Sequence, residues 1–205
     1  MKKKNNKNVN IWILLVVVLF IILTCLVCFD KVNGIDSYFQ SLMINIRTNN
    51  LNNMMMMITN IGSSYTLIAI SFLLLFLLKN KKNSLFILIN LLCSFLSSQV
   101  FKFIIQRDRP STSGLVDTVG YSYPSGHTMV SICFFGFITY LLLKRYNSKA
   151  IKSVICLLFF ITVFFIGFSR IYLGVHYFTD VIAGILLSII YLYFFIKFIY
   201  RKDNK

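Results

Sequence analysis

The chain has 205 residues, of which 58% are hydrophobic and only 13% are charged. Soluble domains carry roughly 25% charged residues, so this composition excludes a soluble protein and favours an integral membrane protein. The net charge of +15 would indicate nucleic acid binding in a soluble protein, but the sequence contains no nucleic-acid motif. We therefore expect one integral membrane domain over residues 1–205, with the lipid bilayer as its surroundings and no nucleic acid partner.

Six apolar segments are long enough to cross a bilayer, which requires about 20 helical residues. The first could be mistaken for a signal peptide, but no small-residue cleavage pattern follows it, so we interpret it as a retained span. The fold class is therefore predicted to be all-α, a bundle of six transmembrane helices. The predicted spans cover residues 11–29, 55–78, 85–105, 127–143, 153–169 and 181–199.

Lysine and arginine are distributed unevenly among the polar segments between these spans. The N-terminus, residues 79–84, residues 144–152 and the C-terminal end (residues 197–205, including the end of the last span) hold 4, 3, 4 and 4 of them, which makes 15 of the 21. Cytoplasmic segments are enriched in Lys and Arg. The distribution predicts a multi-pass protein of the cytoplasmic (inner) membrane, with both termini in the cytoplasm and the remaining polar segments outside.

Smaller features of the chain are interpreted as packing elements. Ile35, Phe39, Leu42 and Ile46 recur at helical spacing among polar residues, which predicts a short amphipathic helix lying on the outer surface. Thr59 and Gly62 are candidates for close helix packing in the second span. The five cysteines all fall inside apolar runs, where hydrophobic packing is favoured over a disulfide or a metal site.

The third span ends in a segment rich in cations. Lys102 falls one turn before the outer end of the span, and Arg109 and Pro110 follow it. A lysine at that depth costs free energy unless it has a function, although a single lysine near a helix end commonly extends its ammonium to the interface.

The fourth span opens with Pro124-Ser125-Gly126-His127. Ser125 is predicted to be the helix N-cap, and Gly126 lets a ligand approach the backbone closely. Free N–H groups at such a helix start can cradle an anion. His127 alone could be an ordinary helix-terminus histidine.

The segment Ser169–Asp180 joins the fifth and sixth spans and contains Arg170, His176 and Asp180. His176 and Asp180 are four residues apart, so on a helix they share a face, where the carboxylate can hold one imidazole nitrogen and leave the other free. His127 is predicted to lie at the same outer face. The two histidines suit a nucleophile and an acid, because one can attack phosphorus while the other protonates the departing oxygen.

Three cations at this face, Lys102, Arg109 and Arg170, favour a multiply charged oxyanion, and phosphate fits best. A metal site with His127, His176 and Asp180 as ligands is the chemical alternative. The adjacent cations argue against it, and the chain contains no glutamate. We therefore expect no metal and no other cofactor.

Three motifs are complete and in order: Lys102–Pro110 reads K-x6-R-P, Pro124–His127 reads P-S-G-H, and Ser169–Asp180 reads S-R-x5-H-x3-D. Together they resemble the type 2 phosphatidic acid phosphatase (PAP2) superfamily. The resemblance implies a metal-independent phosphatase in which His176 becomes phosphorylated, Asp180 orients it and His127 protonates the leaving oxygen. It also implies that the phosphate oxygens are held by Lys102, Arg109, Ser125, Gly126 and Arg170.

The predicted function is hydrolysis of a phosphate monoester or diphosphate from a membrane lipid, because Lys102 lies about 5 Å along its helix from the span end, near the headgroup level. The candidates are undecaprenyl diphosphate, phosphatidylglycerophosphate and phosphatidic acid. The 13 residues between Pro110 and Pro124 form only a small outer loop, which slightly favours the diphosphate. The alternative is a non-catalytic carrier of lipid phosphates or anions that uses the same basic pocket. A carrier is expected to show broken half-helices, which are not evident in the sequence, and no oligomeric state is predicted.

Overall fold

The structure is a computed structural model that describes residues 2–110 and 114–200, without the side chains of residues 2–10. Within that part every regular element is a helix, as predicted. The elements are α1 (Lys2–Cys28), α2 (Asn33–Asn45), α3 (Asn49–Ile61), α4 (Ser64–Leu77), α5 (Lys81–Ile105), α6 (Gly126–Arg145), α7 (Lys149–Tyr172), α8 (Phe178–Phe194) and the π-helical η1 (Phe195–Tyr200).

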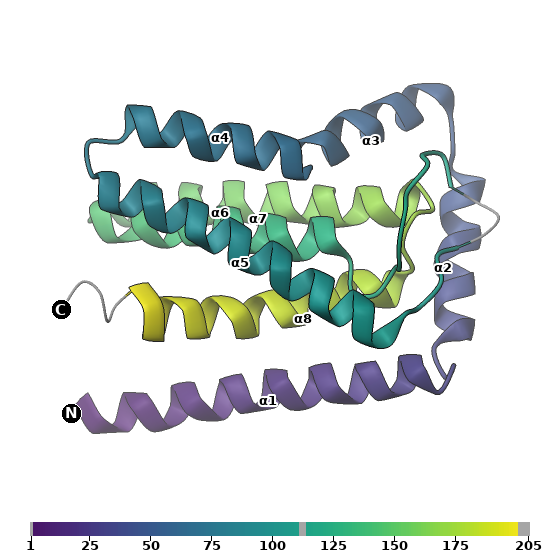
Figure 1. The fold of residues 1–205 in the computed structure, drawn as a ribbon, viewed down its shortest axis with the longest axis horizontal. Helices are drawn as coiled ribbons and strands as arrows, with labels where there is room; N and C mark the ends of the chain where they lie inside the picture. Colours follow the sequence, from purple (N-terminus) through teal and green to yellow (C-terminus); the bar gives the residue numbers. More distant parts are fainter. Residues whose placement is uncertain (1, 111–113, 201–205) are drawn as a thin grey trace.

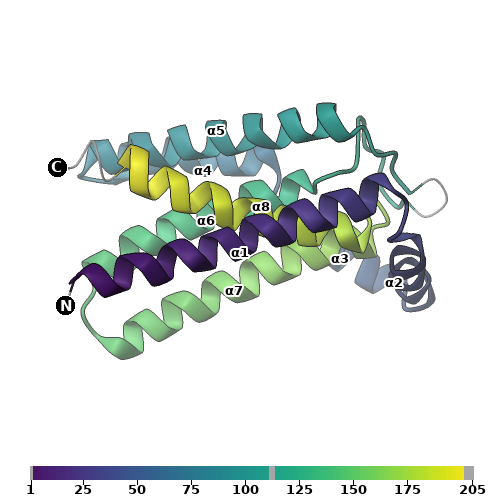
Figure 2. The ribbon, with the colours of Figure 1, turned by 90° about the horizontal axis from the view of Figure 1, so that it is seen from below.

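The long helices run side by side and form an elongated bundle (Figure 1). The start of α1 and the end of η1 lie at one end of it, and α2 crosses the opposite end transversely (Figure 1). Helix α6 is central, since it packs against α4, α5, α7 and α8. Helix α1 lies on the outside against α8, as the second view shows (Figure 2).

Five helices are long and apolar enough to cross a membrane, namely α1, α5, α6, α7 and α8 continued by η1. Helices α3 and α4 pass the same test only as a pair, so six spans result when that pair is counted as one. The chain is thus a multi-pass membrane protein, and the helical bundle predicted from the sequence is confirmed.

The second span is not the continuous helix predicted over residues 55–78. It begins earlier, at Asn49, and is bent by 45° between α3 and α4. Two capping residues cause the break: Gly62 ends α3, and the hydroxyl of Ser63 accepts the N–H of Thr66 and so starts α4. Broken half-helices were not evident in the sequence, so this bend was missed.

Gly62 is required at the break because two other helices press against it. A Cβ atom there would lie 2.6 Å from Ser131 Oγ in α6 and 2.7 Å from Ile166 Cγ2 in α7. Both distances are shorter than real Cβ contacts, so only glycine fits. The close packing predicted at Gly62 is confirmed, and it holds the bend against the middle of the bundle.

The short helix predicted between the first two spans exists as α2, but its packed face differs from the predicted one. Ile35 and Ile46 are each 46% exposed, whereas Met43 and the charged Asp36 are buried. Only Phe39 of the predicted stripe packs inward, with its ring stacked on Phe178 of α8 at 3.9 Å between centroids. The hydrophobic pattern failed here because Asp36 has partners inside the protein, as described below.

Candidate active site

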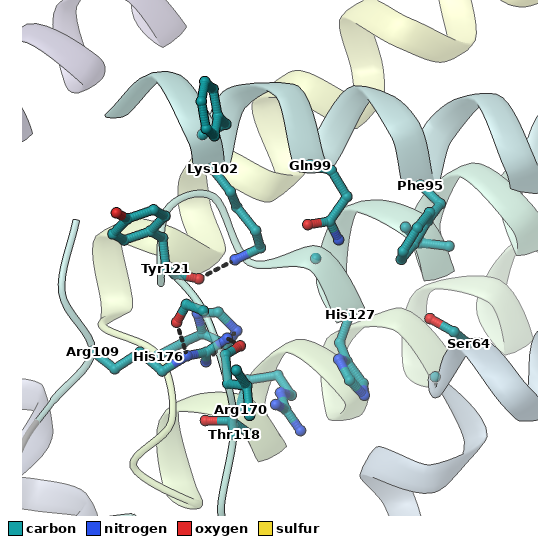
Figure 3. Close-up of a pocket in the computed structure, with 16 residues that line it drawn as sticks. Ser64, Phe95, Gln99, Lys102, Arg109, Thr118, Tyr121, His127, Arg170 and His176 are labelled. Atoms are coloured by element: carbon teal, nitrogen blue, oxygen red, sulfur yellow. Dashed lines mark hydrogen bonds between the residues drawn. The ribbon is translucent and has the colours of Figure 1, made fainter. Parts of the chain in front are cut away.

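A cavity of about 500 Å³ opens at the end of the bundle that α2 crosses. Six of the eight predicted site residues line it (Figure 3), and they come from α5, the loop after α5, the start of α6 and the α7–α8 segment. These six are Lys102, Arg109, Gly126, His127, Arg170 and His176. The other two, Ser125 and Asp180, are fully buried behind the cavity wall.

Lys102 and Arg109 are held by carbonyl oxygens of the outer loop. Lys102 Nζ donates to the carbonyls of Tyr121, at 2.6 Å, and of Ser122, at 3.2 Å. Arg109 donates from Nε to the carbonyl of Gly120, at 2.7 Å, and from Nη1 to that of Val175, at 2.8 Å. The loop that looked merely compact in the sequence thus fixes two cations in place.

Arg170 reaches the cavity from the last turn of α7. It is 3% exposed, and its Nη1 donates to the hydroxyl of Thr59 in α3 at 2.7 Å. Its Nε is buried and has no hydrogen-bond partner within the described residues. Thr59, which the sequence suggested only as a packing position, therefore orients a cation in the site.

The three cations share one electrostatic property. Within residues 2–110 and 114–200, no carboxylate lies within salt-bridge distance of Lys102, Arg109 or Arg170. Their closest hydrogen bonds go to carbonyl and hydroxyl oxygens, and a buried cation without a paired counter-ion is costly. The arrangement is suited to an anion that brings several negative oxygens into the cavity.

His176 and Asp180 are brought together, but by a route that differs from the predicted helical face. His176 precedes α8, and Asp180 lies in its first turn, where Asp180 Oδ2 accepts the backbone N–H of Tyr177 at 2.9 Å. The same oxygen lies 3.5 Å from His176 Nδ1, which has no hydrogen-bond partner among the described residues. The other ring nitrogen, Nε2, lies 3.4 Å from Arg109 Nη1 at the cavity.

The surroundings of His176 favour its neutral form. Burial, followed by the positive charges of Arg170, Lys102 and Arg109, holds the pKa of His176 well below its ordinary value of 6.5. A neutral imidazole has a free lone pair, and a histidine nucleophile requires one. The lowered pKa therefore favours a neutral His176 ring with a free lone pair at neutral pH.

The first turn of α6 presents its backbone to the cavity. Ser125 occupies the N-cap position, as predicted, but its hydroxyl pairs with Thr128 Oγ1 at 2.9 Å and makes no cap hydrogen bond. The leading N–H groups of α6 are thus not capped by a side chain. Gly126 lines the cavity, and a Cβ there would meet Ser98 Oγ at 3.3 Å and Lys102 Cε at 3.6 Å. At this turn the cavity wall consists of Gly126 and backbone, whereas the Ser125 hydroxyl pairs with Thr128.

Comparison with known proteins matches residues 83–204 to the model of the PAP2 superfamily. The chain belongs to the PAP2 superfamily. It is 33% identical to a Bacillus subtilis protein named phosphatidylglycerophosphatase B, over 87% of this chain and 89% of that protein. It is 29% identical to an undecaprenyl-diphosphatase of Sulfolobus acidocaldarius, over 67% of this chain and 66% of that one.

A solved structure supports the same assignment. The crystal structure of a transmembrane PAP2-type phosphatidylglycerolphosphate phosphatase from Bacillus subtilis matches with a TM-score of 0.85 and 27% identity, over 94% of this chain and 97% of that one. The fold, the family and the lipid phosphatase class predicted from the sequence are thereby confirmed. The roles of individual PAP2 site residues stay predictions.

One PAP2 site feature was missed by the sequence reasoning. Arg107 lies within the K-x6-R-P segment at a position that the motif leaves open, and it contacts both Asp180 and Asp36. No pattern in the sequence indicated this contact, because Asp36 is one of the polar residues among which the apolar stripe of the predicted helix recurs.

The donor set does not match a metal centre. Within the described residues, no three His, Cys, Asp or Glu side chains are grouped so as to hold a metal ion. His127 and His176 lie apart in the cavity wall, with Arg170 between them in the close-up (Figure 3). Cations occupy the positions in which a metal site would gather acids.

Proposed function

We propose that this PAP2 enzyme hydrolyses a phosphate monoester or diphosphate of a membrane lipid through a phosphohistidine at His176. The observation that carries the proposal is the position of His176, with Nε2 facing a cavity lined by three cations that have no carboxylate partner. A phosphate bound among those cations meets a neutral imidazole at its phosphorus.

The reaction proceeds in two displacements. First, the Nε2 lone pair of His176 attacks phosphorus, the P–N bond forms and the P–O bond to the lipid breaks. His127 gives its proton to the departing oxygen, and Asp180 stabilises the positive charge on the His176 ring. Then water attacks phosphorus, the P–N bond breaks, and His127 takes the proton from that water. Inorganic phosphate leaves and His176 is restored.

Lys102, Arg109, Arg170 and the Gly126 amide stabilise the charge on the nonbridging oxygens in both steps. The family resemblance implies that Ser125 holds a phosphate oxygen, but its geometry here supports a different role. Its hydroxyl pairs with Thr128 and stands behind the cavity wall, so we propose that Ser125 fixes the turn that presents the Gly126 amide.

A lipid substrate suits the walls of the cavity. The cavity is also lined by Phe95 and Phe103 of α5 and by Val130 of α6, all in membrane-spanning helices. These side chains favour an alkyl or prenyl chain that continues from the phosphate into the hydrocarbon region.

The charge distribution supports a site on the extracytoplasmic side of a cytoplasmic membrane, with both termini in the cytoplasm. Lys79 lies between α4 and α5, Lys81 and Lys82 begin α5, and Lys144 and Arg145 end α6. All of them lie at the end of the bundle where α1 starts (Figure 1). The positive-inside rule assigns that end to the cytoplasm. The further cations at residues 201–205 lie outside the described residues.

We propose phosphatidylglycerophosphate as the first substrate to test, with undecaprenyl diphosphate and phosphatidic acid beside it. The support is the 33% identity, over most of both chains, to the relative named phosphatidylglycerophosphatase B. The small outer loop also favours compact headgroups. A panel of the three lipids in mixed micelles, assayed for phosphate release, ranks them by kcat/KM.

The variant His176→Ala separates the enzyme from a carrier. The broken α3–α4 span is the one observation that favours a carrier, since broken helices are typical of transporters. We expect His176→Ala to lose phosphate release while it still binds the lipid phosphate. Release at the wild-type rate by the variant, or lipid transport without release by the wild type, would rule out the proposal.

Metal independence is tested with chelator and vanadate. The PAP2 enzyme is expected to retain activity in EDTA, because cations of the protein neutralise the phosphate. Vanadate, which mimics five-coordinate phosphorus, is expected to inhibit it. Loss of activity on chelation that zinc or magnesium restores would contradict this mechanism.

A further inference from the structure

Arg107 differs from the three cations that line the cavity. Its guanidinium contacts two carboxylates, Asp180 Oδ1 at 2.7 Å from Nη1 and Asp36 Oδ2 at 2.7 Å from Nη2. Its Nη1 also donates to Thr179 Oγ1 at 2.9 Å, and its guanidinium carbon lies 4.1 Å from the ring centre of Tyr177. Arg107 does not line the candidate catalytic cavity but a second cavity, which Asp36 and Tyr177 also line.

Asp36 is the other end of this contact. It is only 2% exposed although it lies on α2, the helix that crosses the end of the bundle. Its Oδ1 accepts the backbone N–H of Thr179 at 3.0 Å, and its Oδ2 accepts the Thr179 hydroxyl at 2.7 Å. Asp36 thus caps the first turn of α8, where a carboxylate is favoured by the free N–H groups and the helix dipole.

Together these contacts fix both oxygens of Asp180. Oδ1 is held by Arg107, while Oδ2 is held by the N–H of Tyr177 and faces Nδ1 of His176. A carboxylate that is hydrogen-bonded at both oxygens cannot rotate about its Cβ–Cγ bond without breaking those bonds. The orientation of Asp180 toward His176 therefore depends on a guanidinium that is itself anchored to α2.

The guanidinium of Arg107 also supplies a positive charge to the Asp180 carboxylate, which would otherwise interact more strongly with the cations of the cavity. Asp180 interacts electrostatically with Lys102 and Arg109, two of the cations of the cavity. Without a local counter-charge, the Asp180 carboxylate would compete with phosphate for those cations. Burial acts to lower the pKa of Arg107, but the carboxylates of Asp180 and Asp36 outweigh it and the pKa is raised. Arg107 is thus a permanent cation beside Asp180.

We propose that Arg107 and Asp36 are positioning residues that hold the Asp180 carboxylate against His176 and away from the phosphate-binding cations. The path runs from Asp36 on α2 through Arg107 to Asp180, and it gives the transverse helix a part in turnover. This inference rests on the proposed role of His176 as nucleophile. It adds Asp36, which lies outside the three PAP2 motifs, and Arg107, which occupies a position that the first motif leaves open.

The test measures kcat and KM for phosphate release from a lipid phosphate in micelles by purified full-length variants. Asp36→Asn is expected to lower kcat roughly 10-fold, as displaced supporting groups do, with KM changed less than about threefold because the cavity residues are untouched. Arg107→Gln is expected to lower kcat at least as much. In the double variant the losses should not multiply, because Asp36 acts through Arg107.

Tyr172→Phe is the matched control. It removes a polar contact at the same end of the bundle, from the Tyr172 hydroxyl to Asn52 Oδ1 at 2.7 Å, without touching Asp180. We expect this variant to keep the wild-type kcat. Arg107→Gln leaves Asp36 and Asp180 without their cation and can fail to fold. In that case Asp36→Asn, which preserves the shape of the side chain, tests the positioning role alone.

Three results would overturn the inference: a wild-type kcat in Asp36→Asn, a rise in KM at constant kcat, or an equal loss of kcat in Tyr172→Phe. Losses that multiply in the double variant would also contradict the path through Arg107. His176→Ala separates the two hypotheses. If it stays active, the proposed mechanism fails; if it is inactive while Asp36→Asn has wild-type kcat, only the positioning role fails.

Discussion

Gly184 sets the distance between the two helix starts that carry the candidate catalytic histidines. It lies in α8, where a Cβ atom would meet Ser125 O at 3.0 Å, Thr128 Cβ at 3.2 Å and Met129 N at 3.4 Å. Two of these atoms are backbone and the third is attached to it directly, so none can rotate away. Gly184→Ala therefore has to push the first turn of α6 away from α8.

The size of the effect follows from these distances. The contact with Ser125 O needs about 0.4 Å more to become ordinary, and dense packing around it resists that shift. Overpacking of this kind costs about 1–3 kcal/mol of stability. A 1 Å misplacement costs about 100-fold in rate, so a shift of about 0.4 Å is expected to lower kcat roughly fivefold.

Phosphate release from a micellar lipid phosphate, measured beside thermal unfolding, tests this reasoning. Gly136→Ala is the control, because it also adds a methyl group between α6 and α8 but meets the mobile Leu192 Cδ1, at 2.9 Å. Gly136 is nine residues from His127, about 14 Å along the helix. Unchanged kcat and stability in Gly184→Ala, or an equal loss of kcat in Gly136→Ala, would refute the argument.

Three further predictions concern single side chains. In histidine-labelled enzyme, NMR should find the titration midpoint of His176 well below 6.5, because burial and the adjacent cations lower its pKa. His127→Ala provides the assignment, and a midpoint near 6.5 would contradict the prediction. Thr59→Val removes the hydroxyl that holds Arg170, so it should raise KM several-fold and lower the stability measured by thermal unfolding by about 1–3 kcal/mol. An unchanged KM would show that Arg170 does not depend on this hydroxyl. Arg109→Lys should lower kcat/KM about 10-fold or more and weaken vanadate inhibition, since lysine lacks the planar fork that reaches two carbonyls; wild-type values would count against it.

The sequence predicted the parts of this molecule that depend on local pattern. Apolar length identified the spans, and motif spacing identified six residues that line one cavity. The bend at Gly62 was not predictable in this way, because it arises from contacts with α6 and α7 that no local pattern encodes. The turn of Ser125 away from the cavity likewise depends on its pairing with Thr128.

The packed face of α2 shows a different limit. A hydrophobic stripe predicts which side of a helix is buried only when no polar side chain on another side has hydrogen-bond partners inside the protein. Asp36 has three hydrogen-bond partners, contributed by Arg107 and Thr179, and these orient the helix so that Ile35 and Ile46 face outward. All of these partners are more than 70 residues away in the sequence, so the preference appears only in three dimensions.

One contact joins the second and third motifs without any side chain. The backbone N–H of Ser125 donates to the backbone carbonyl of Asp180 at 3.0 Å. Because an alanine at either position keeps the main-chain donor and acceptor, alanine scanning cannot detect this bond, and its contribution would be credited to other residues. The donor is lost only when the main-chain nitrogen loses its hydrogen, as when an ester replaces the amide or proline replaces Ser125. Part of what holds the two helix starts together therefore escapes a scan of side chains.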